Sequence, residues 1–302
     1  MKGPGFFPEE IIFSATTACN LHCPHCYVNR QNIKLSVPQS IDFLKSCKGT
    51  SIQKIGFTGG EPFLYFDFLT EITKAAVSMD FLFDQIMTNG DWWQTENQLK
   101  DELQKVYDCG YDGKFGLSWD NFHAQKTERI KIFIRNVQEI FGQDSINIQT
   151  VKCEDKNHQK NEAEINKDYI QSVFPQIQIY ELPQVFQCDD ERAWKSKKWF
   201  REDFCQGPGN IFFVHPDGNI APCCGFSNEE TELFIGTIND SYEKLIENAG
   251  KSKMIELCFS RGLHTKIKDW KKFCKVNGIK KPGKTSDICT FCQAVCKSKL
   301  MD

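Results

Sequence analysis

The sequence has no long apolar run and no excess of positive charge. Its 302 residues contain no stretch of about 18 consecutive apolar residues, and residues 1–10 lack the apolar core of a secretion signal. The net charge is −3 and the isoelectric point is near 6.1, whereas nucleic-acid binding normally requires a basic face. These absences argue against a membrane protein, an exported protein and a nucleic-acid-binding protein, so we expect a cytoplasmic location.

Internal repeats and low-complexity segments are also absent. The composition, 40% hydrophobic and 25% charged, is ordinary for a globular protein, and the length exceeds that of one typical domain. Fifteen cysteines without a secretion signal do not suit a disulfide framework, because the cytosol keeps thiols reduced, so metal or redox chemistry is the better interpretation. Isolated cysteines are usually small buried apolar residues, which we expect of Cys47, Cys109, Cys153 and Cys188.

Short apolar runs alternate with helical patterns from about residue 10 to residue 183, which is typical of parallel βα units. Strands are expected at 10–16, 53–58, 83–88, 114–119, 146–151 and 176–182. Helices are expected near 38–47, 66–79, 95–108, 125–141 and 159–171. In α/β barrels the loops at the carboxyl ends of the strands carry the chemistry, so we expect the functional residues to collect at one mouth.

Directly after the first expected strand, Cys19, Cys23 and Cys26 follow a C-x3-C-x2-C spacing. Three thiolates on one short loop suit a [4Fe-4S] cluster whose fourth iron is open, whereas a structural zinc site needs a fourth ligand. His22 or His25 could supply that ligand. A zinc knuckle and a set of buried thiols therefore remain alternatives for this loop.

Two further elements follow in the same order at later strand ends. Gly59-Gly60-Glu61-Pro62 follows the second expected strand, and Asn89-Gly90 ends the third. With the cysteine loop, these elements resemble the radical SAM superfamily. The resemblance implies a partial (β/α)6 TIM-like barrel that binds S-adenosylmethionine (SAM), with the Gly-Gly-Glu segment near its methionyl ammonium. The candidate cofactor-binding residues are Gly59, Gly60, Glu61, Asn89, Ser118, Tyr27 and His25.

The fourth expected strand ends in a polar segment that contains Ser118, Asp120 and His123. Ser118 could reach the ribose or the carboxylate of SAM. Asp120 and His123 could contact substrate, or they could form an ordinary turn-capping pair with each other.

The βα rhythm ends at residues 184–204, so we expect a radical SAM barrel at 1–184 and a small auxiliary cluster domain at 185–302. Cys205, Gly218 and Cys223 form a C-x12-G-x4-C frame around an apparent hairpin whose turn is Pro216–Asn219. The hairpin brings the two cysteines to one end, and the pair Cys289 and Cys292 completes a set of four thiols. Such a set suits an auxiliary [4Fe-4S] cluster, with a zinc site as the alternative.

This second part resembles the SPASM and twitch extensions of radical SAM enzymes that modify peptides and proteins. The full SPASM pattern of seven cysteines is not cleanly present. Cys258, Cys274 and Cys296 are candidates for extra ligands, but their spacing from Cys289 and Cys292 does not match, so we expect one auxiliary cluster.

Cys224 adjoins the expected ligand Cys223. Neighbouring residues on an extended segment point to opposite sides, so Cys224 should face away from the cluster and could donate a hydrogen atom. A second buried thiol and a substitute ligand are the alternatives.

Four short segments, at 57–61, 118–123, 222–224 and 288–292, resemble the YydG-type (EpeE) peptide epimerases, which convert L to D residues in ribosomally made peptides. The loop at Gln206–Asn210 differs from theirs. The resemblance implies Cα hydrogen abstraction and hydrogen return from Cys224. A radical SAM enzyme that cross-links a peptide is the alternative, and a regulatory cluster- or zinc-binding module is a third.

The implied partners are a ribosomally synthesised precursor peptide and a flavodoxin or ferredoxin reductant, with no nucleic acid and no membrane. The first expected strand begins near residue 10, so we expect the peptide leader to bind the catalytic chain itself or a separate protein. A run of lysines could hold an acidic leader or form an ordinary solvated face. These lysines are Lys266, Lys268, Lys271, Lys272, Lys275, Lys280, Lys281 and Lys284.

Overall fold

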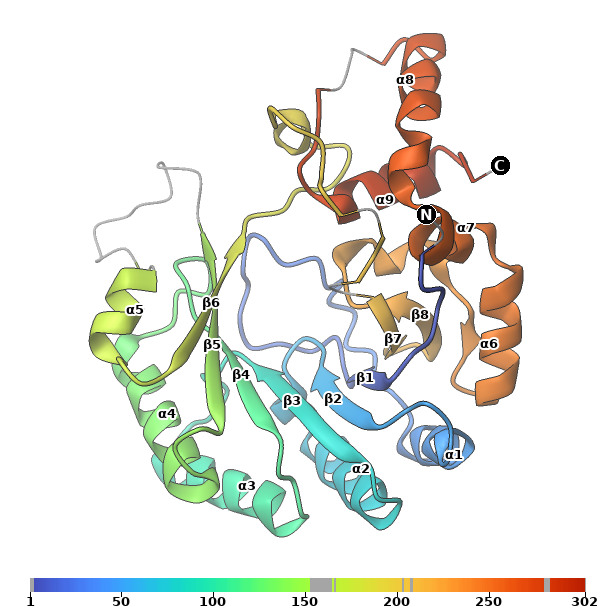
Figure 1. Ribbon diagram of the computed structural model, residues 1–302. Coiled ribbons are helices and arrows are strands. Elements are labelled where there is room, and N and C mark those ends of the chain that lie inside the picture. The colour runs from blue at the N-terminus through green and yellow to red at the C-terminus, as the bar shows by residue number, and fades with distance from the viewer. Residues whose placement is uncertain are drawn as a thin grey trace.

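The computed structural model describes residues 3–152, 165, 167–202, 204–206, 209–279 and 283–301. Its described strands form one sheet in the order β6-β5-β4-β3-β2-β1-β7-β8-β9, in which β1 to β7 run parallel (Figure 1). The sheet is curved, with α1 to α4 along its outer face (Figure 1). The predicted α/β fold with a TIM-like partial barrel is confirmed.

The six strands expected from the βα pattern are all present, with ends within two residues of their predicted positions. They are β1 (Glu10–Ser14), β2 (Lys54–Thr58), β3 (Leu82–Thr88), β4 (Lys114–Ser118), β5 (Ile146–Lys152) and β6 (Gln178–Pro183). The helices between them are α1 (Val37–Cys47), α2 (Phe66–Ser78), α3 (Glu96–Asp108), α4 (Thr127–Phe141) and α5 (Lys167–Val173). Much of the helix predicted at 159–171 lies outside the described residues, as does Cys153.

Alternation along β1 shows how the sheet separates its two faces. Ile11 and Phe13 are fully buried, and the Phe13 ring packs edge-on against Phe68 of α2 with ring centroids 5.8 Å apart. Side chains alternate across a strand, so Glu10 and Ile12 face the opposite, concave side of the sheet. A Cβ placed on Gly56 of β2 would lie 3.0 Å from Glu10 Oε1 and 3.4 Å from Ile12 Cγ1, which puts these side chains over the neighbouring strand.

The predicted hairpin is confirmed. It consists of β7 (Gly209–Val214) and the antiparallel β8 (Asn219–Cys223), followed by the short β9 (Gly236–Thr237). In its turn, the His215 N–H donates to Asn219 O (2.8 Å), and Gly218 has a φ of +89°, which favours glycine. β7 pairs with β1 directly, so the hairpin extends the barrel sheet.

The remaining helices are α6 (Tyr242–Lys251), α7 (Lys253–Glu256), α8 (Ile267–Val276) and α9 (Ile288–Lys297), and a π-helical turn at Leu257–Arg261 follows α7. Short 3-10 helices lie at Pro62–Tyr65, Glu191–Trp194, Phe226–Glu229, Thr231–Leu233 and Leu263–Lys266. Within the described residues, no helix is long and apolar enough to cross a membrane.

Candidate active site

The three-cysteine loop lies between β1 and α1, at the carboxyl end of β1. Cys19 and Cys23 are half-buried and Cys26 is exposed, and the Cys26 N–H donates to Cys23 O (3.1 Å) to close a turn. Two N–H groups approach the Cys19 sulfur, from the Leu21 backbone (3.4 Å) and the Asn89 amide (3.8 Å). Donors directed at a sulfur suit a metal-bound thiolate, so the loop fits an iron–sulfur cluster.

The Gly59-Gly60 pair packs against the chain segment that leads into Cys19. Gly60 N donates to Thr16 O (2.7 Å), and Glu61 N donates to Ala18 O (2.8 Å). A Cβ on Gly60 would lie 2.2 Å from Ala18 O, and Gly59 has a φ of +142°. The two glycines therefore allow two backbones to touch, and this contact positions the cysteine loop.

Glu61 is completely buried beneath the end of β3. Its Oε1 accepts from Phe63 N (3.2 Å) and Thr88 Oγ1 (2.9 Å), and its Oε2 accepts from Asn89 N (2.8 Å). Burial raises the pKa of Glu61 to about 7, against the opposing effect of these hydrogen bonds. The carboxyl group fixes the backbone at Asn89; its predicted contact with SAM stays a prediction.

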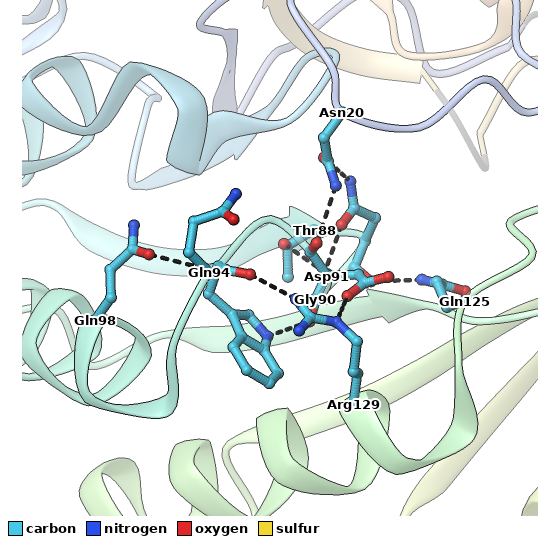
Figure 2. A network of polar contacts seen from close by, with 10 residues as sticks. Asn20, Thr88, Gly90, Asp91, Gln94, Gln98, Gln125 and Arg129 are labelled. Carbon is cyan, nitrogen blue, oxygen red and sulfur yellow. Dashed lines mark hydrogen bonds and ion pairs between the residues drawn. The ribbon is translucent and has the colours of Figure 1, made fainter.

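Asn89 links the cysteine loop to the barrel through a polar network, of which Figure 2 labels Asn20, Asp91, Gln125 and Arg129. Its side chain donates to Asn20 Oδ1 (2.9 Å) and accepts from Asp91 N (2.8 Å), while Asn20 donates to Asp91 O (3.0 Å). Gln125 donates to both Asn89 O and Ser118 O, and Arg129 of α4 forms an ion pair with Asp91. The loop that carries the three cysteines is thereby tied to the ends of β3 and β4.

Asp120 and His123 form the turn-capping pair that was one of the two alternatives. Asp120 is 1% exposed, and its Oδ1 accepts from Phe122 N (2.9 Å), His123 N (3.2 Å) and His123 Nδ1 (2.8 Å). Burial alone would raise the pKa of Asp120, but the bonded and charged His123 holds it below its ordinary value. The hydrogen bonds to Asp120 and Cys23 outweigh desolvation and raise the pKa of His123 to about 10.

The His25 ring, on the cysteine loop, packs against the segment after β4. Its centroid lies 4.7 Å from the Phe122 ring and 5.1 Å from the His123 ring. Burial lowers the pKa of His25, and its Nδ1 is buried without a hydrogen-bond partner among the described residues. His25, Asp120 and His123 each have a potential metal-ligand atom within 4.8 Å of the others.

Tyr27 connects the cysteine loop to the C-terminal part of the chain. Its hydroxyl donates to Val185 O (2.8 Å), and its ring stacks on Phe226 with centroids 5.1 Å apart. Phe226 lies two residues after Cys224. The loop and the segment that follows β8 are therefore neighbours.

The four predicted auxiliary cysteines line one pocket, together with a fifth that the sequence interpretation had not favoured. Cys205 precedes β7, Cys223 ends β8, and α9 carries Cys289 and Cys292 one turn apart. The fifth is Cys258 on the π-helical turn, and the other lining residues are mostly apolar. The lining cysteines are Cys205, Cys223, Cys258, Cys289 and Cys292. A cluster of thiols in an apolar pocket fits an iron–sulfur group.

Cys292 lies beside another thiol of this pocket. Its sulfur lies 3.9 Å from Cys258 Sγ, and hydrogen bonds from Cys258, Cys296 and Ser227 hold its pKa well below the ordinary value. Two of the unassigned cysteines thus contact a predicted ligand. The third, Cys274, is buried and does not line the pocket.

Cys224 lies outside the lining of the five-cysteine pocket, unlike its neighbour Cys223. It is exposed, yet desolvation, with the charges of Glu10 and Asp84, raises its pKa to about 11. A side chain can be both exposed and partly desolvated when water reaches it from one side only. Because Glu10 faces the concave side of the sheet, Cys224 lies on the side of the pocket that borders the barrel interior, and its charge also raises the pKa of Cys205, Cys223 and Cys289.

The lysine run is not a uniform exposed face. Lys266 is 4% exposed and lies 3.4 Å from Asp269 Oδ2, and Lys280 and Lys281 lie outside the described residues. Among the single cysteines, Cys47 is buried as expected, and Cys109 and Cys188 are half-buried.

Comparisons with known proteins show what this chain is similar to. The family described as "4Fe-4S single cluster domain" matches residues 1–132. YydG from Bacillus subtilis (strain 168), provisionally named as a peptide biosynthesis protein, is 23% identical over 305 residues that cover 97% of this chain and 93% of that protein. GTP 3′,8-cyclase from Chlorobaculum tepidum is 32% identical over 123 residues, 39% of this chain and 34% of that enzyme.

Two solved structures share the fold. Native anSMEcpe with bound AdoMet and Cp18Cys peptide has a TM-score of 0.58 at 15% identity, over 97% of this chain and 96% of that chain. Streptococcus suis SuiB bound to the precursor peptide SuiA has a TM-score of 0.50 at 13% identity, over 94% of this chain and 76% of that chain. The cluster-domain match covers the first four barrel strands, and the likeness to YydG spans nearly the whole chain, so both comparisons agree with the resemblance to the radical SAM superfamily.

Proposed function

We propose that this chain is a peptide-modifying radical SAM enzyme that converts L to D residues in a ribosomally made precursor peptide. The name of YydG points to peptide biosynthesis, and the structures of anSMEcpe and SuiB contain bound peptides. The observation that carries epimerisation is the separation of two adjacent thiols. Cys223 lines the five-cysteine pocket, whereas Cys224 lies outside it near Glu10 of the barrel interior.

Two groups of cysteines would hold the cofactors. Cys19, Cys23 and Cys26 would bind a [4Fe-4S] cluster with SAM, and a second [4Fe-4S] cluster would occupy the pocket of Cys205, Cys223, Cys289 and Cys292. When bound, the first cluster with SAM supplies a 5′-deoxyadenosyl radical that removes a Cα hydrogen, and the second supplies single electrons.

Cys224 would return the hydrogen atom. Its S–H bond breaks homolytically as the new Cα–H bond forms, which leaves the unpaired electron on the Cys224 sulfur. The sulfur then regains its thiol by taking up one electron and one solvent proton. Because the pKa of Cys224 is about 11, the side chain keeps its S–H near neutral pH and remains a hydrogen-atom donor.

The barrel and the C-terminal part have complementary tasks in this proposal, with a boundary at 184/185. The first binds SAM and the peptide, and the second holds the auxiliary cluster behind Cys224. A flavodoxin or ferredoxin would supply the reducing electrons in the cytoplasm.

The decisive experiment is turnover of a precursor peptide in heavy water with wild type, Cys224→Ala and the control Cys109→Ala. Wild type should place one deuterium at each inverted Cα, because the thiol exchanges its proton with solvent. Cys224→Ala should keep its iron and still cleave SAM, but form no D residue. Cys109→Ala should match wild type, because this half-buried cysteine directly follows α3 and belongs to neither cysteine group.

D residues that carry deuterium in the Cys224→Ala product would refute the donor assignment. A wild-type product that has lost two hydrogens and gained no deuterium would instead establish the cross-linking alternative.

A further inference from the structure

The helix α8 carries four exposed lysines in ten residues. These residues are Lys268, Lys271, Lys272 and Lys275. None of them forms an ion pair within the part of the chain that the structure describes, because the only carboxylate of the helix, Asp269, lies 3.4 Å from the buried Lys266 instead. Lysines one turn apart on a helix repel one another, so this face holds positive charge that the helix does not neutralise.

A second group of exposed lysines follows the 3-10 helix Glu191–Trp194. The segment 195–201 has four positive side chains and no carboxylate. Its exposed lysines are Lys195, Lys197 and Lys198. The ammonium of Lys271 lies 5.7 Å from the centroid of the Trp199 ring, so this segment packs against α8. We call the exposed lysines of α8 and of the segment 195–201 the lysine surface. It is a local concentration of positive charge in a chain whose net charge is −3.

Aromatic rings connect the lysine surface to the five-cysteine pocket. The Trp199 ring lies edge-on to Phe291 with centroids 5.6 Å apart, and Phe200 lies 5.4 Å from the same ring. Phe291 is fully buried in α9, between Cys289 and Cys292 of the pocket. Packed rings therefore lead from the lysine surface to the helix that carries two of the proposed cluster ligands.

The position of α8 leaves this surface open to a partner. Figure 1 shows α8 at one end of the molecule, farther from the barrel sheet than α9. A partner bound to α8 can thus approach the pocket side of α9 without entering the barrel, where the peptide would be altered under the proposed function.

We propose that the lysine surface is the docking site of an acidic protein that carries single electrons, such as a flavodoxin. The inference rests on the proposed function, which places a redox cluster in the five-cysteine pocket. The reduced carrier loses one electron and the oxidised cluster gains it, with no atom transferred. Complementary charge speeds brief encounters of this kind and does not require a large apolar interface.

An acidic peptide leader is the other occupant that the lysine run suggests. The ring contacts favour the electron carrier, because the rate of electron transfer falls steeply with distance and packed atoms shorten the path to α9. A leader peptide would need the positive charge but would gain nothing from rings that lead to Cys289 and Cys292.

Charge reversal of three lysines tests the docking site. The variant combines Lys268→Glu, Lys272→Glu and Lys275→Glu, and it keeps the contact of Lys271 with Trp199. The control makes the same change of charge at exposed lysines of α2 and α3 and combines Lys74→Glu, Lys100→Glu and Lys105→Glu. Each protein is reconstituted in full length without oxygen, and its iron and zinc are counted first.

Two measurements use a flavodoxin as the probe. Titration with the oxidised flavodoxin gives its affinity, and stopped-flow mixing with the reduced flavodoxin gives the rate at which the flavin loses an electron. In about 0.02 M salt, the α8 variant should bind and react about tenfold more weakly and slowly than wild type, and the control should stay within about twofold. In about 0.5 M salt the three proteins should converge, because salt screens the lysines.

An iron-replete α8 variant with the affinity and rate of wild type in low salt would overturn the proposal. If the variant loses iron, the three lysines are changed to Gln instead, and wild-type behaviour of that protein would count equally against the docking site. Unchanged flavodoxin binding with lost binding of hexaglutamate would assign the surface to an acidic peptide. Zinc in place of iron in the five-cysteine pocket would remove the auxiliary cluster from the proposed function, which the metal count detects separately.

Discussion

At the scale of single residues, the polar side chains near the three-cysteine loop mostly position one another. Glu61 holds the backbone of Asn89, and Asn89 holds Asn20 between Cys19 and Cys23. Glu61 and Asn89 are buried, so a hydrogen bond lost between them leaves an unpaired polar atom that costs about 1–3 kcal/mol. The geometry of the loop therefore depends on residues other than its three cysteines.

Glu61 predicts a pH dependence of stability. Its pKa is about 7 in the folded chain against an ordinary value of 4.5, so the folded state binds this proton more tightly. The resulting stabilisation is complete below pH 4.5 and is lost as the pH rises through 7. At roughly 1.4 kcal/mol per pH unit, wild type should lose about 2–3 kcal/mol from this group between pH 5 and pH 7.5.

Glu61→Gln should lose less stability over the same interval, because the amide does not titrate. Anaerobic chemical denaturation followed by tryptophan fluorescence at the two pH values measures the difference. Glu71→Gln, on the exposed surface of α2, is the control and should stay within about 0.5 kcal/mol of wild type at both values. An equal change in unfolding free energy between the two pH values for wild type and Glu61→Gln would contradict the raised pKa of Glu61.

At the scale of elements, the five-cysteine pocket is assembled from the β7–β8 hairpin, the π-helical turn and α9. The π turn is the element that brings Cys258 within 3.9 Å of Cys292. Short π segments commonly occur at functional sites, and this one places an extra thiol beside a predicted ligand. A contact between two sulfurs is compatible with one ligand and one hydrogen-bond donor.

Cys258 should therefore be dispensable for cluster binding. Cys258→Ala is expected to keep the iron content of wild type, with a lower auxiliary reduction potential, because Cys292 loses a hydrogen-bond donor. Cys292→Ala should lose the auxiliary cluster. Iron and sulfide analysis with the electronic spectrum measures both. A comparable iron loss in the two variants would instead make Cys258 a ligand.

At the scale of the whole molecule, the expected boundary at 184/185 does not coincide with the edge of the sheet. β7 pairs with β1 from Glu10 to Phe13, and Phe212 of β7 packs its ring 6.0 Å from Phe43 of α1. The sheet continues from the barrel through the hairpin to β9. The two parts proposed for the chain thus share one hydrogen-bonded sheet and one apolar core.

Truncation tests this continuity. Residues 1–184 alone would expose the unpaired edge of β1 and the apolar surface that Phe212 covers, so we expect this fragment to aggregate and to show no cooperative unfolding. The full chain should unfold in one transition. Calorimetry measures the cooperativity of unfolding, and size-exclusion chromatography measures aggregation. A soluble fragment with a sharp transition of its own would support an independent barrel domain.

Local patterns in the sequence were sufficient for much of this description. The six barrel strands follow from apolar runs, and the hairpin follows from the turn at Pro216–Asn219, because both depend on neighbouring residues. The three-cysteine loop and the Gly-Gly-Glu-Pro element are likewise short, contiguous motifs. Their order along the chain carries the resemblance to the radical SAM superfamily without any coordinates.

Long-range packing decided the rest. The entry of Cys258 into the pocket, the stacking of Tyr27 on Phe226 and the pairing of β7 with β1 each join segments that are distant in the chain. No spacing rule encodes such contacts, because they depend on how helices and loops pack once the sheet has formed. The sequence alone therefore specified the elements and the cofactor motifs, and the tertiary structure determined which side chains surround them.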